Sequence, residues 1–169
     1  MNYFKLLAIE EKYELDPADL NKQYFANLTK YHPDRAQGTE QKREYQELSI
    51  NINKAYSTLK DDLKRAEHIL NLHNIATDET ALKNKISKEK LAEIWEEYDL
   101  LDDVNHLTEL EYLLNEKQIK YEKLTANLKE AFKNNDFNCV LDIIISFKYL
   151  VTLIDNIKLK IKNANNRDQ

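Results

Sequence analysis

The sequence predicts an all-α protein built in two parts, and three observations lead to this conclusion. The chain of 169 residues contains one glycine, two prolines and no Asn-Gly or Asp-Gly pair. Because sheets depend on turns rich in these residues, their scarcity favours long helices joined by few loops. Apolar residues recur at intervals of three and four, the spacing of one helical face. This periodicity fades between residues 73 and 86, which divides the chain into two.

The first part is predicted to form a helical hairpin. Asp16 and Pro17 suit a helix start, because the carboxylate caps free backbone amides and proline fits the first turn. This helix must end near Tyr31, since Pro33 lacks an amide hydrogen and disfavours helical geometry at His32. The apolar face of the second hairpin helix comprises Tyr45, Leu48, Ile52, Ala55, Tyr56 and Leu59. Short flanking helices are expected at residues 3–9 and 63–72.

The second part is predicted to be a three-helix bundle. Its first helix begins at the capping residue Ser87, its second covers residues 107–131, and its third runs from Phe137 through Ile154. Such amphipathic helices suit antiparallel packing at shallow angles. We therefore assign residues 1–76 to an N-terminal domain, 77–86 to a linker and 87–169 to a C-terminal domain.

Composition excludes several classes of function. A net charge of −5 disfavours nucleic-acid binding, which needs clustered cations. A single cysteine, Cys139, excludes an internal disulfide and a cysteine-based zinc site, and its apolar helix predicts that it is buried. The acidic start fits no targeting peptide, and the stretch Leu141–Ile154, interrupted by Asp142 and Lys148, is too short to span a bilayer. A cytoplasmic location without membrane attachment is expected.

His32-Pro33-Asp34 lies at the tip of the predicted hairpin. It follows Lys30-Tyr31 and precedes Ile52-Asn53-Lys54-Ala55-Tyr56-Ser57-Thr58-Leu59 on the next helix, and the chain starts with Asn2-Tyr3-Phe4-Lys5-Leu6-Leu7. With this flanking pattern the sequence resembles a J-domain. The resemblance implies a protein that stimulates ATP hydrolysis by a DnaK-class chaperone, docking through the loop and the helix before it.

Each residue of the loop has chemistry that suits this docking. Pro33 stiffens the turn and lowers the entropy lost on binding, Asp34 offers a carboxylate to a partner arginine, and His32 offers a donor and an acceptor. By resemblance, Lys22 and Lys30 face an acidic chaperone surface. The helix carries only these two lysines, with Asn21, Gln23 and Asn27 at positions open to charge, so weak and salt-sensitive docking is expected.

Two other interpretations of the tripeptide carry less weight. It can simply end a helix, with Asp34 forming an Asx turn. A hydrolase lacks support, because no second acid, metal-ligand cluster, phosphate-binding loop or nucleophile motif accompanies His32 and Asp34. The other histidines, at positions 68, 73 and 106, have no ligand spacing. No enzyme activity, cofactor or metal is predicted.

The opening residues, the stretch Arg65-Ala66-Glu67-His68-Ile69-Leu70 and the three-helix tail resemble the HscB family of iron–sulfur assembly co-chaperones. That resemblance implies that the tail binds the iron–sulfur scaffold protein (IscU) and that the J-domain presents it to an HscA-type chaperone. Matching Lys90-Leu91-Ala92-Glu93 to the family's Phe-Leu-Met-Glu carries the scaffold-binding role to Leu91, Ala92, Trp95, Glu96, Asp99, Asp103 and, on the last helix, Tyr149. The family's zinc module, present in some members, is absent.

Helical geometry gives this assignment partial support. Ile94, Tyr98 and Leu101 define the buried direction, with Leu91 and Trp95 at its flank. The carboxylates point away, so an apolar strip borders a row of acids, as a partner surface requires. The pattern leaves open whether Trp95 packs into the bundle and the acids are merely solvated. It also leaves open a J-domain co-chaperone for another client, or a non-enzymatic helical adaptor.

Overall fold

The computed structural model describes residues 1–166, and this part of the chain contains helices and no strand. The predicted all-α fold is therefore confirmed. The chain separates into two compact units, the first over Met1–Ile75 and the second from Ala76 onward. The last three residues of the predicted 87–169 domain lie outside the described residues.

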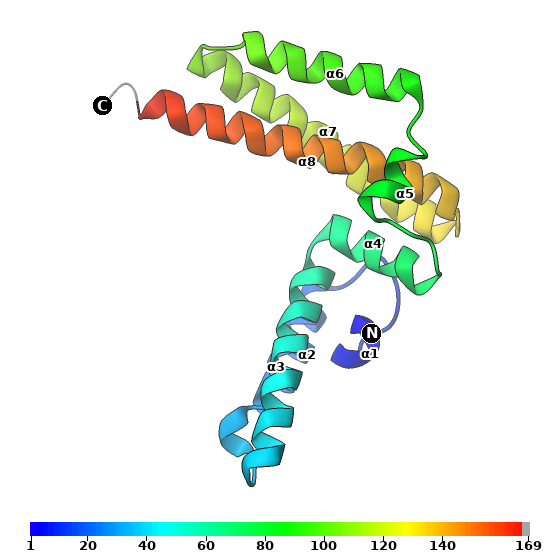
Figure 1. The fold of residues 1–169 in the computed structure, drawn as a ribbon, viewed down its shortest axis with the longest axis vertical. Coiled ribbons are helices and arrows are strands. Elements are labelled where there is room, and N and C mark those ends of the chain that lie inside the picture. Colours follow the sequence, from blue (N-terminus) through cyan, green and yellow to red (C-terminus); the bar gives the residue numbers. More distant parts are fainter. Residues whose placement is uncertain (167–169) are drawn as a thin grey trace. The chain divides into compact units, whose positions relative to one another are not determined.

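The first unit consists of α1 (Tyr3–Leu7), α2 (Pro17–Lys30), the 3₁₀ turn η1 (Pro33–Arg35), α3 (Thr39–Lys60) and α4 (Asp62–Leu72). Helices α2 and α3 form the predicted hairpin, α1 packs against both, and α4 packs against α3 (Figure 1). The core residues of this unit include Phe4, Leu7, Leu20, Ile52, Ala55, Leu59, Ala66 and Leu70.

Capping residues set the ends of the hairpin helices. The Asp16 carboxylate accepts a hydrogen bond from the Ala18 amide at 2.9 Å, and α2 ends at Lys30 with Tyr31 as its cap. Gly38 precedes α3 with a φ of 90°, a left-handed conformation that a side chain would strain. The one glycine of the sequence thus starts the longer helix of the hairpin.

Two polar side chains on α4 pack inside the first unit. Arg65 is 7% exposed, donates to the Leu59 carbonyl at 2.6 Å and forms an ion pair with Asp62. The half-buried ring of His68 stacks on Tyr3, with ring centroids 4.4 Å apart, and its Nε2 accepts the Tyr3 amide at 3.1 Å. Burial is the main reason that the pKa of His68 is lowered from 6.5, with the amino-terminal charge adding to the effect.

The second unit contains α5 (Glu79–Lys83), α6 (Lys88–Asp103), α7 (Leu107–Lys133) and α8 (Phe137–Asn165). Helices α7 and α8 form an extensive antiparallel pair, and α6 contacts α8 more sparsely (Figure 1). The core comes mainly from α8, with Val140, Leu141, Ile144, Phe147, Leu150, Leu153 and Ile157 all buried. The three long helices match the predicted bundle.

The segment predicted as a linker contains the short helix α5. The Asp78 carboxylate caps it by accepting the Thr80 and Ala81 amides at 3.1 Å, and Leu82 on its inner side is 7% exposed. Five residues are too few to show helical periodicity in the sequence. Residues from Ala76 onward belong to the second compact unit.

One expectation about α8 is wrong, and the helix is longer than the apolar stretch that predicted it. Cys139 is exposed, because it lies on the side of α8 away from the buried residues Val140 and Ile144. The apolar stretch belongs to a helix of 29 residues, which is long and apolar enough to cross a membrane by length and composition. However, 44% of its most apolar window is buried, as in the core helix of a bundle.

Candidate partner-binding sites

The His32-Pro33-Asp34 tripeptide lies at the exposed tip of the α2–α3 hairpin. The side chains of His32 and Asp34 are 58% and 82% exposed. His32 Nδ1 accepts the Asp34 amide at 3.2 Å, so histidine, and not the Asx turn considered for Asp34, caps η1. Because Nδ1 is engaged within the loop, Nε2 is the ring nitrogen left for a partner. The tip thus offers an imidazole nitrogen beside a carboxylate.

Contacts from both hairpin helices hold this tip in place. Arg35 Nη1 donates to the Thr29 carbonyl at 3.0 Å, which satisfies one of the free carbonyls at the end of α2. On α3, Ser49 Oγ donates to the Tyr31 carbonyl at 3.0 Å, and the ring of Tyr45 meets that of Tyr31 edge-on at 5.6 Å. The supporting roles of Arg35 and Ser49 are not visible in the sequence, because both depend on how α3 returns along α2.

The two predicted lysines are exposed on α2. Lys30 Nζ lies 4.9 Å from the centre of the Tyr31 ring, and its hydrogen bond to Tyr31 raises its pKa. Asn21 and Asn27 have internal partners in place of the charge that was considered for them. Asn21 Oδ1 accepts the Tyr56 hydroxyl at 2.6 Å, and Asn27 donates to the Gln23 carbonyl at 2.8 Å.

The solvent face of α2 also carries Phe25, which was not among the predicted site residues. Phe25 is 62% exposed and packs beside Tyr24, with ring centroids 5.1 Å apart. Tyr24 in turn stacks on Tyr56 of α3 at 4.0 Å. The face that holds Lys22 and Lys30 is therefore partly apolar, so its charge is lower than that of a purely basic face.

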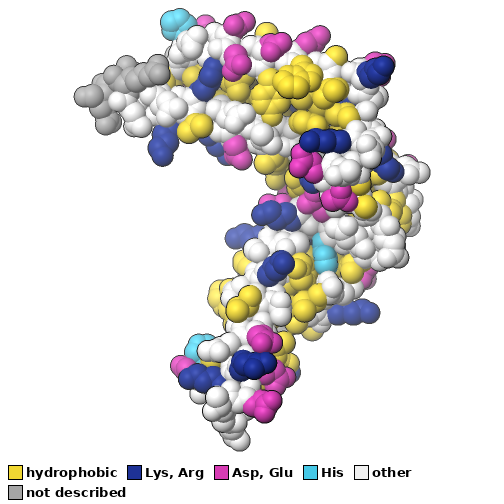
Figure 2. All heavy atoms as spheres, in the orientation of Figure 1, with side chains coloured by type: hydrophobic (Ala, Val, Ile, Leu, Met, Phe, Trp, Pro, Cys, Tyr) yellow, Lys and Arg dark blue, Asp and Glu magenta, His cyan; other side chains and the backbone are white. Residues whose placement is uncertain are grey.

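In the second unit, α6 presents the predicted scaffold-binding residues to solvent. Ile94 and Leu101 are buried, whereas Trp95 is 61% exposed and Leu91 is 37% exposed. Ala92, Glu96, Asp99 and Asp103 are all exposed. Figure 2 shows hydrophobic side chains gathered between α6 and α8, with acidic side chains along the outer edge of α6. The question left open for Trp95 is answered: its indole lies outside the bundle core.

Ion pairs with α7 fix one flank of α6. Glu97 lies 2.5 Å from Lys120 Nζ and 3.5 Å from Lys117 Nζ, and Lys117 is itself only 6% exposed. Burial alone would raise the pKa of Glu97, but the two lysines outweigh it and hold the pKa below its usual value. Leu91 and Trp95 lie on the other flank of α6, so the ion pairs of Glu97 with Lys117 and Lys120 orient them away from α7.

A lysine from α8 holds the carboxyl end of α6. Lys160 Nζ donates to the carbonyls of Leu101, Asp102 and Val104 at 2.5, 3.1 and 3.3 Å. The Leu101 carbonyl also accepts the backbone amide of the capping residue Val104 at 3.3 Å, and a cation suits the negative end of the helix dipole. Lys117, Lys120 and Lys160 were absent from the predicted site, because buried or capping lysines leave no periodic signal.

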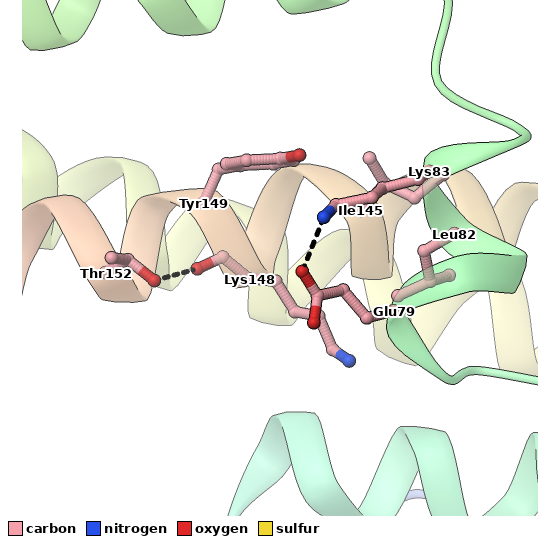
Figure 3. Close-up of a pocket in the computed structure, with 7 residues that line it drawn as sticks. All are labelled: Glu79, Leu82, Lys83, Ile145, Lys148, Tyr149 and Thr152. Atoms are coloured by element: carbon pink, nitrogen blue, oxygen red, sulfur yellow. Dashed lines mark hydrogen bonds and ion pairs between the residues drawn. The ribbon is translucent and has the colours of Figure 1, made fainter.

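Tyr149 separates two hollows on α8. Together with Ile94 and Tyr98 it lines a small cleft between α6 and α8. On its other side lies a pocket of about 160 Å³ between α5 and α8, lined by Leu82 and Ile145 among others (Figure 3). Tyr149 is the predicted scaffold-binding residue that does not lie on α6, and it lies at the edge of both hollows.

Residues 1–166 contain no group of three or more histidine, cysteine, aspartate or glutamate side chains that could hold a metal ion. His68 lies inside the first unit, and the side chain of His73 is within 3.9 Å of Glu11. The chemistry that the described side chains offer at these surfaces is recognition: hydrogen bonds at the hairpin tip, and an apolar strip with acids on α6.

Comparison with known proteins agrees with both units. The DnaJ domain model matches residues 2–68. The chain is 31% identical to the co-chaperone protein HscB of Proteus mirabilis, over 94% of each chain. It is 27% identical to the human iron–sulfur cluster co-chaperone protein HscB, over 94% of this chain and 68% of the human protein.

Two solved structures share the arrangement of helices at similar identity. The crystal structure of human co-chaperone protein HscB matches with a TM-score of 0.86 and 26% identity, over 95% of this chain and 82% of that one. Chaperone HscB from Vibrio cholerae matches with a TM-score of 0.82 and 26% identity, over 93% and 96%. Together with the His-Pro-Asp tip and the nearly full coverage of a relative at 31% identity, these matches place the chain in the HscB family of J-domain co-chaperones.

Proposed function

We propose that this protein stimulates the ATPase of a DnaK/HscA-class chaperone and delivers the iron–sulfur cluster scaffold protein (IscU type) to it for cluster transfer. His32, Pro33 and Asp34, with Lys22 and Lys30, contact the chaperone. Leu91, Ala92, Trp95, Glu96, Asp99, Asp103 and Tyr149 bind the scaffold. The protein acts in the cytoplasm, hydrolyses nothing itself, and requires no cofactor, membrane or nucleic acid.

The observation that carries the proposal is the pair of exposed recognition surfaces, one on each compact unit. The first is a braced loop in which the side chains of His32 and Asp34 are both exposed. The second is an exposed tryptophan beside a row of carboxylates on a helix whose other flank is fixed to α7. Relatives that cover nearly the whole chain are named co-chaperones, and the human one is named for iron–sulfur clusters.

The physical logic of each surface differs. At the loop, a charge-assisted hydrogen bond from a partner arginine to Asp34 is stronger than a neutral one and needs little ordering, because the tip is already braced. At α6, burial of the large Trp95 side chain supplies area, and the acids select a basic partner. Binding at the loop and binding at α6 should therefore be independent of each other.

Separate substitutions test this two-site division. His32→Gln should abolish stimulation of an HscA-type ATPase and leave scaffold affinity unchanged. Trp95→Ala should weaken scaffold binding about 30-fold, as expected for an interface anchor worth about 2 kcal/mol, and leave basal stimulation intact. Leu100→Ala is the matched control, because Leu100 is 65% exposed on the same helix but on a different flank.

The measurements are steady-state ATPase rates with and without scaffold, and titration calorimetry of the scaffold. Synergy between scaffold and this protein in the ATPase assay supports the proposal. If the wild-type protein stimulates the chaperone but binds no scaffold at micromolar concentration, its client is another protein. If no DnaK-class chaperone responds to it, the protein is a helical adaptor and the proposal fails.

A further inference from the structure

The pocket between α5 and α8 has the size and lining of a receptor for one apolar side chain. Its volume of about 160 Å³ compares with the roughly 150 Å³ of an engineered cavity that binds benzene. Its floor is apolar, since Leu82 and Ile145 contribute side chains that are 7% and 5% exposed. Figure 3 shows Tyr149 forming one wall and Lys83 with Glu79 the opposite rim.

The pocket exists because α5 is fixed to the second unit. Lys148 Nζ donates to the carbonyl of Thr77 at 3.2 Å, Thr77 is 6% exposed, and Asp78 caps the helix that follows. A pocket whose two walls are held by hydrogen bonds loses little entropy when a partner enters it. This gives the segment predicted as a linker a structural purpose.

The charged groups at the rim already have partners. Lys83 Nζ lies 2.6 Å from Glu79, which raises the pKa of the lysine, and Lys148 donates to Thr77. The pocket therefore presents no free ion to neutralise a charged ligand. An apolar floor surrounded by polar groups that already have partners is typical of the centre of a protein interface. Such a pocket favours an aliphatic or aromatic side chain.

Helix geometry places the pocket on the same side of the bundle as the exposed tryptophan. On α6, Glu97 faces α7, and Trp95 lies on the opposite flank. On α8, Phe147 is on the buried side, whereas Ile145 and Thr152 lie on the flank away from it. Tyr149 lines both hollows, so a partner that covers Tyr149 also lies at the edge of the pocket.

We infer that the α5–α8 pocket is part of the scaffold-binding surface and takes one aliphatic or aromatic side chain of the scaffold protein. This inference rests on the proposed function and extends it from α6 and Tyr149 to α5. Leu82, Ile145 and Thr152 join the residues that contact the scaffold, and none of them was among the predicted ones.

Blocking the mouth of the pocket tests the inference. Thr152 is exposed at the rim, so Thr152→Arg puts a long charged side chain over the opening without touching the core. Thr108→Arg on α7 makes the same chemical change at an exposed threonine that lines neither hollow. Scaffold affinity should fall about tenfold for Thr152→Arg and less than twofold for Thr108→Arg, with melting temperatures unchanged.

A second measurement uses the wild-type protein. Methyl NMR signals of Leu82 and Ile145 should shift when the scaffold is added, and those of Ile119, exposed on α7, should not. If Thr152→Arg binds normally and these methyls do not respond, while Trp95→Ala still weakens binding, the pocket is not part of the surface and the proposed function stands. If Trp95→Ala also binds normally, the scaffold site itself is wrong and the inference falls with it.

Discussion

The buried guanidinium of Arg65 should be one of the main polar supports of the first unit. Arg65→Met removes a charged donor from the Leu59 carbonyl at the end of α3, separates the ion pair with Asp62, and deletes the contact of the guanidinium with the Tyr13 ring at 4.7 Å. Methionine keeps most of the apolar stem of the side chain. The loss is therefore chiefly electrostatic.

The structure sets the size of this effect. A hydrogen bond to a charged group contributes about 1.5–3 kcal/mol, and a partly buried cation–π contact adds about 1 kcal/mol. Asp62 is 30% exposed, so water compensates much of its lost partner. We expect the first unit to lose about 3 kcal/mol, which for a domain of this size lowers the melting temperature by roughly 15 °C.

Urea and thermal unfolding followed by circular dichroism would measure this change. Arg43→Met is the control, because Arg43 is 83% exposed and its ion pair is with Glu47 one turn away, so no measurable change is expected. Arg65→Lys should fall between the two, since lysine keeps the charge but loses the planar fork. A loss below about 1 kcal/mol for Arg65→Met would refute the view that this network stabilises the fold.

Three further predictions concern titration and the placement of α6. The pKa of His68 is lower in the folded state than its unfolded value of 6.5, so the unfolded chain binds more protons just below that pH. The contribution of His68 to the stability of the first unit should therefore be complete above pH 6.5 and decline as pH falls. His68→Phe should flatten this decline when melting temperature is measured against pH. Glu97 has a lowered pKa, so its contribution to the stability of the second unit is present above pH 4.5 and is lost as pH falls through its folded pKa. Glu97→Gln should remove this pH dependence from the acid unfolding of the second unit. Lys160→Met should speed hydrogen exchange at the carboxyl end of α6, because Lys160 caps that end. It should also weaken scaffold binding severalfold, although Lys160 is not part of the exposed strip on α6. Unchanged hydrogen exchange would contradict the capping role.

Local rules in the sequence predicted the hairpin well, because its ends depend on residues close to them. Asp16 caps α2 and Pro33 ends it, and neither effect requires knowledge of the rest of the fold. The exposed positions of α6 followed from helical spacing once Ile94 and Leu101 defined its buried side. The loss of periodicity from residue 73 predicted a division of the chain in that region.

Features that depend on tertiary contacts were missed. Helix α5 needs the side of α8 to bury Leu82, and periodicity cannot be recognised in five residues. Cys139 lies in an apolar stretch but on its exposed side, a distinction that composition does not make. The burial of Lys117 could not be foreseen, because its partner Glu97 comes from another helix.

The way α6 is attached separates recognition from folding. Ile94 and Leu101 are the buried side chains that α6 contributes, Tyr98 packs beside them, and ion pairs to α7 and the lysine cap from α8 complete the attachment. Residues on its outer side can therefore be exchanged with little effect on the α7–α8 core. Selection could retune client choice along this one helix, and a designer could graft a new binding face onto it, while the rest of the bundle keeps its sequence.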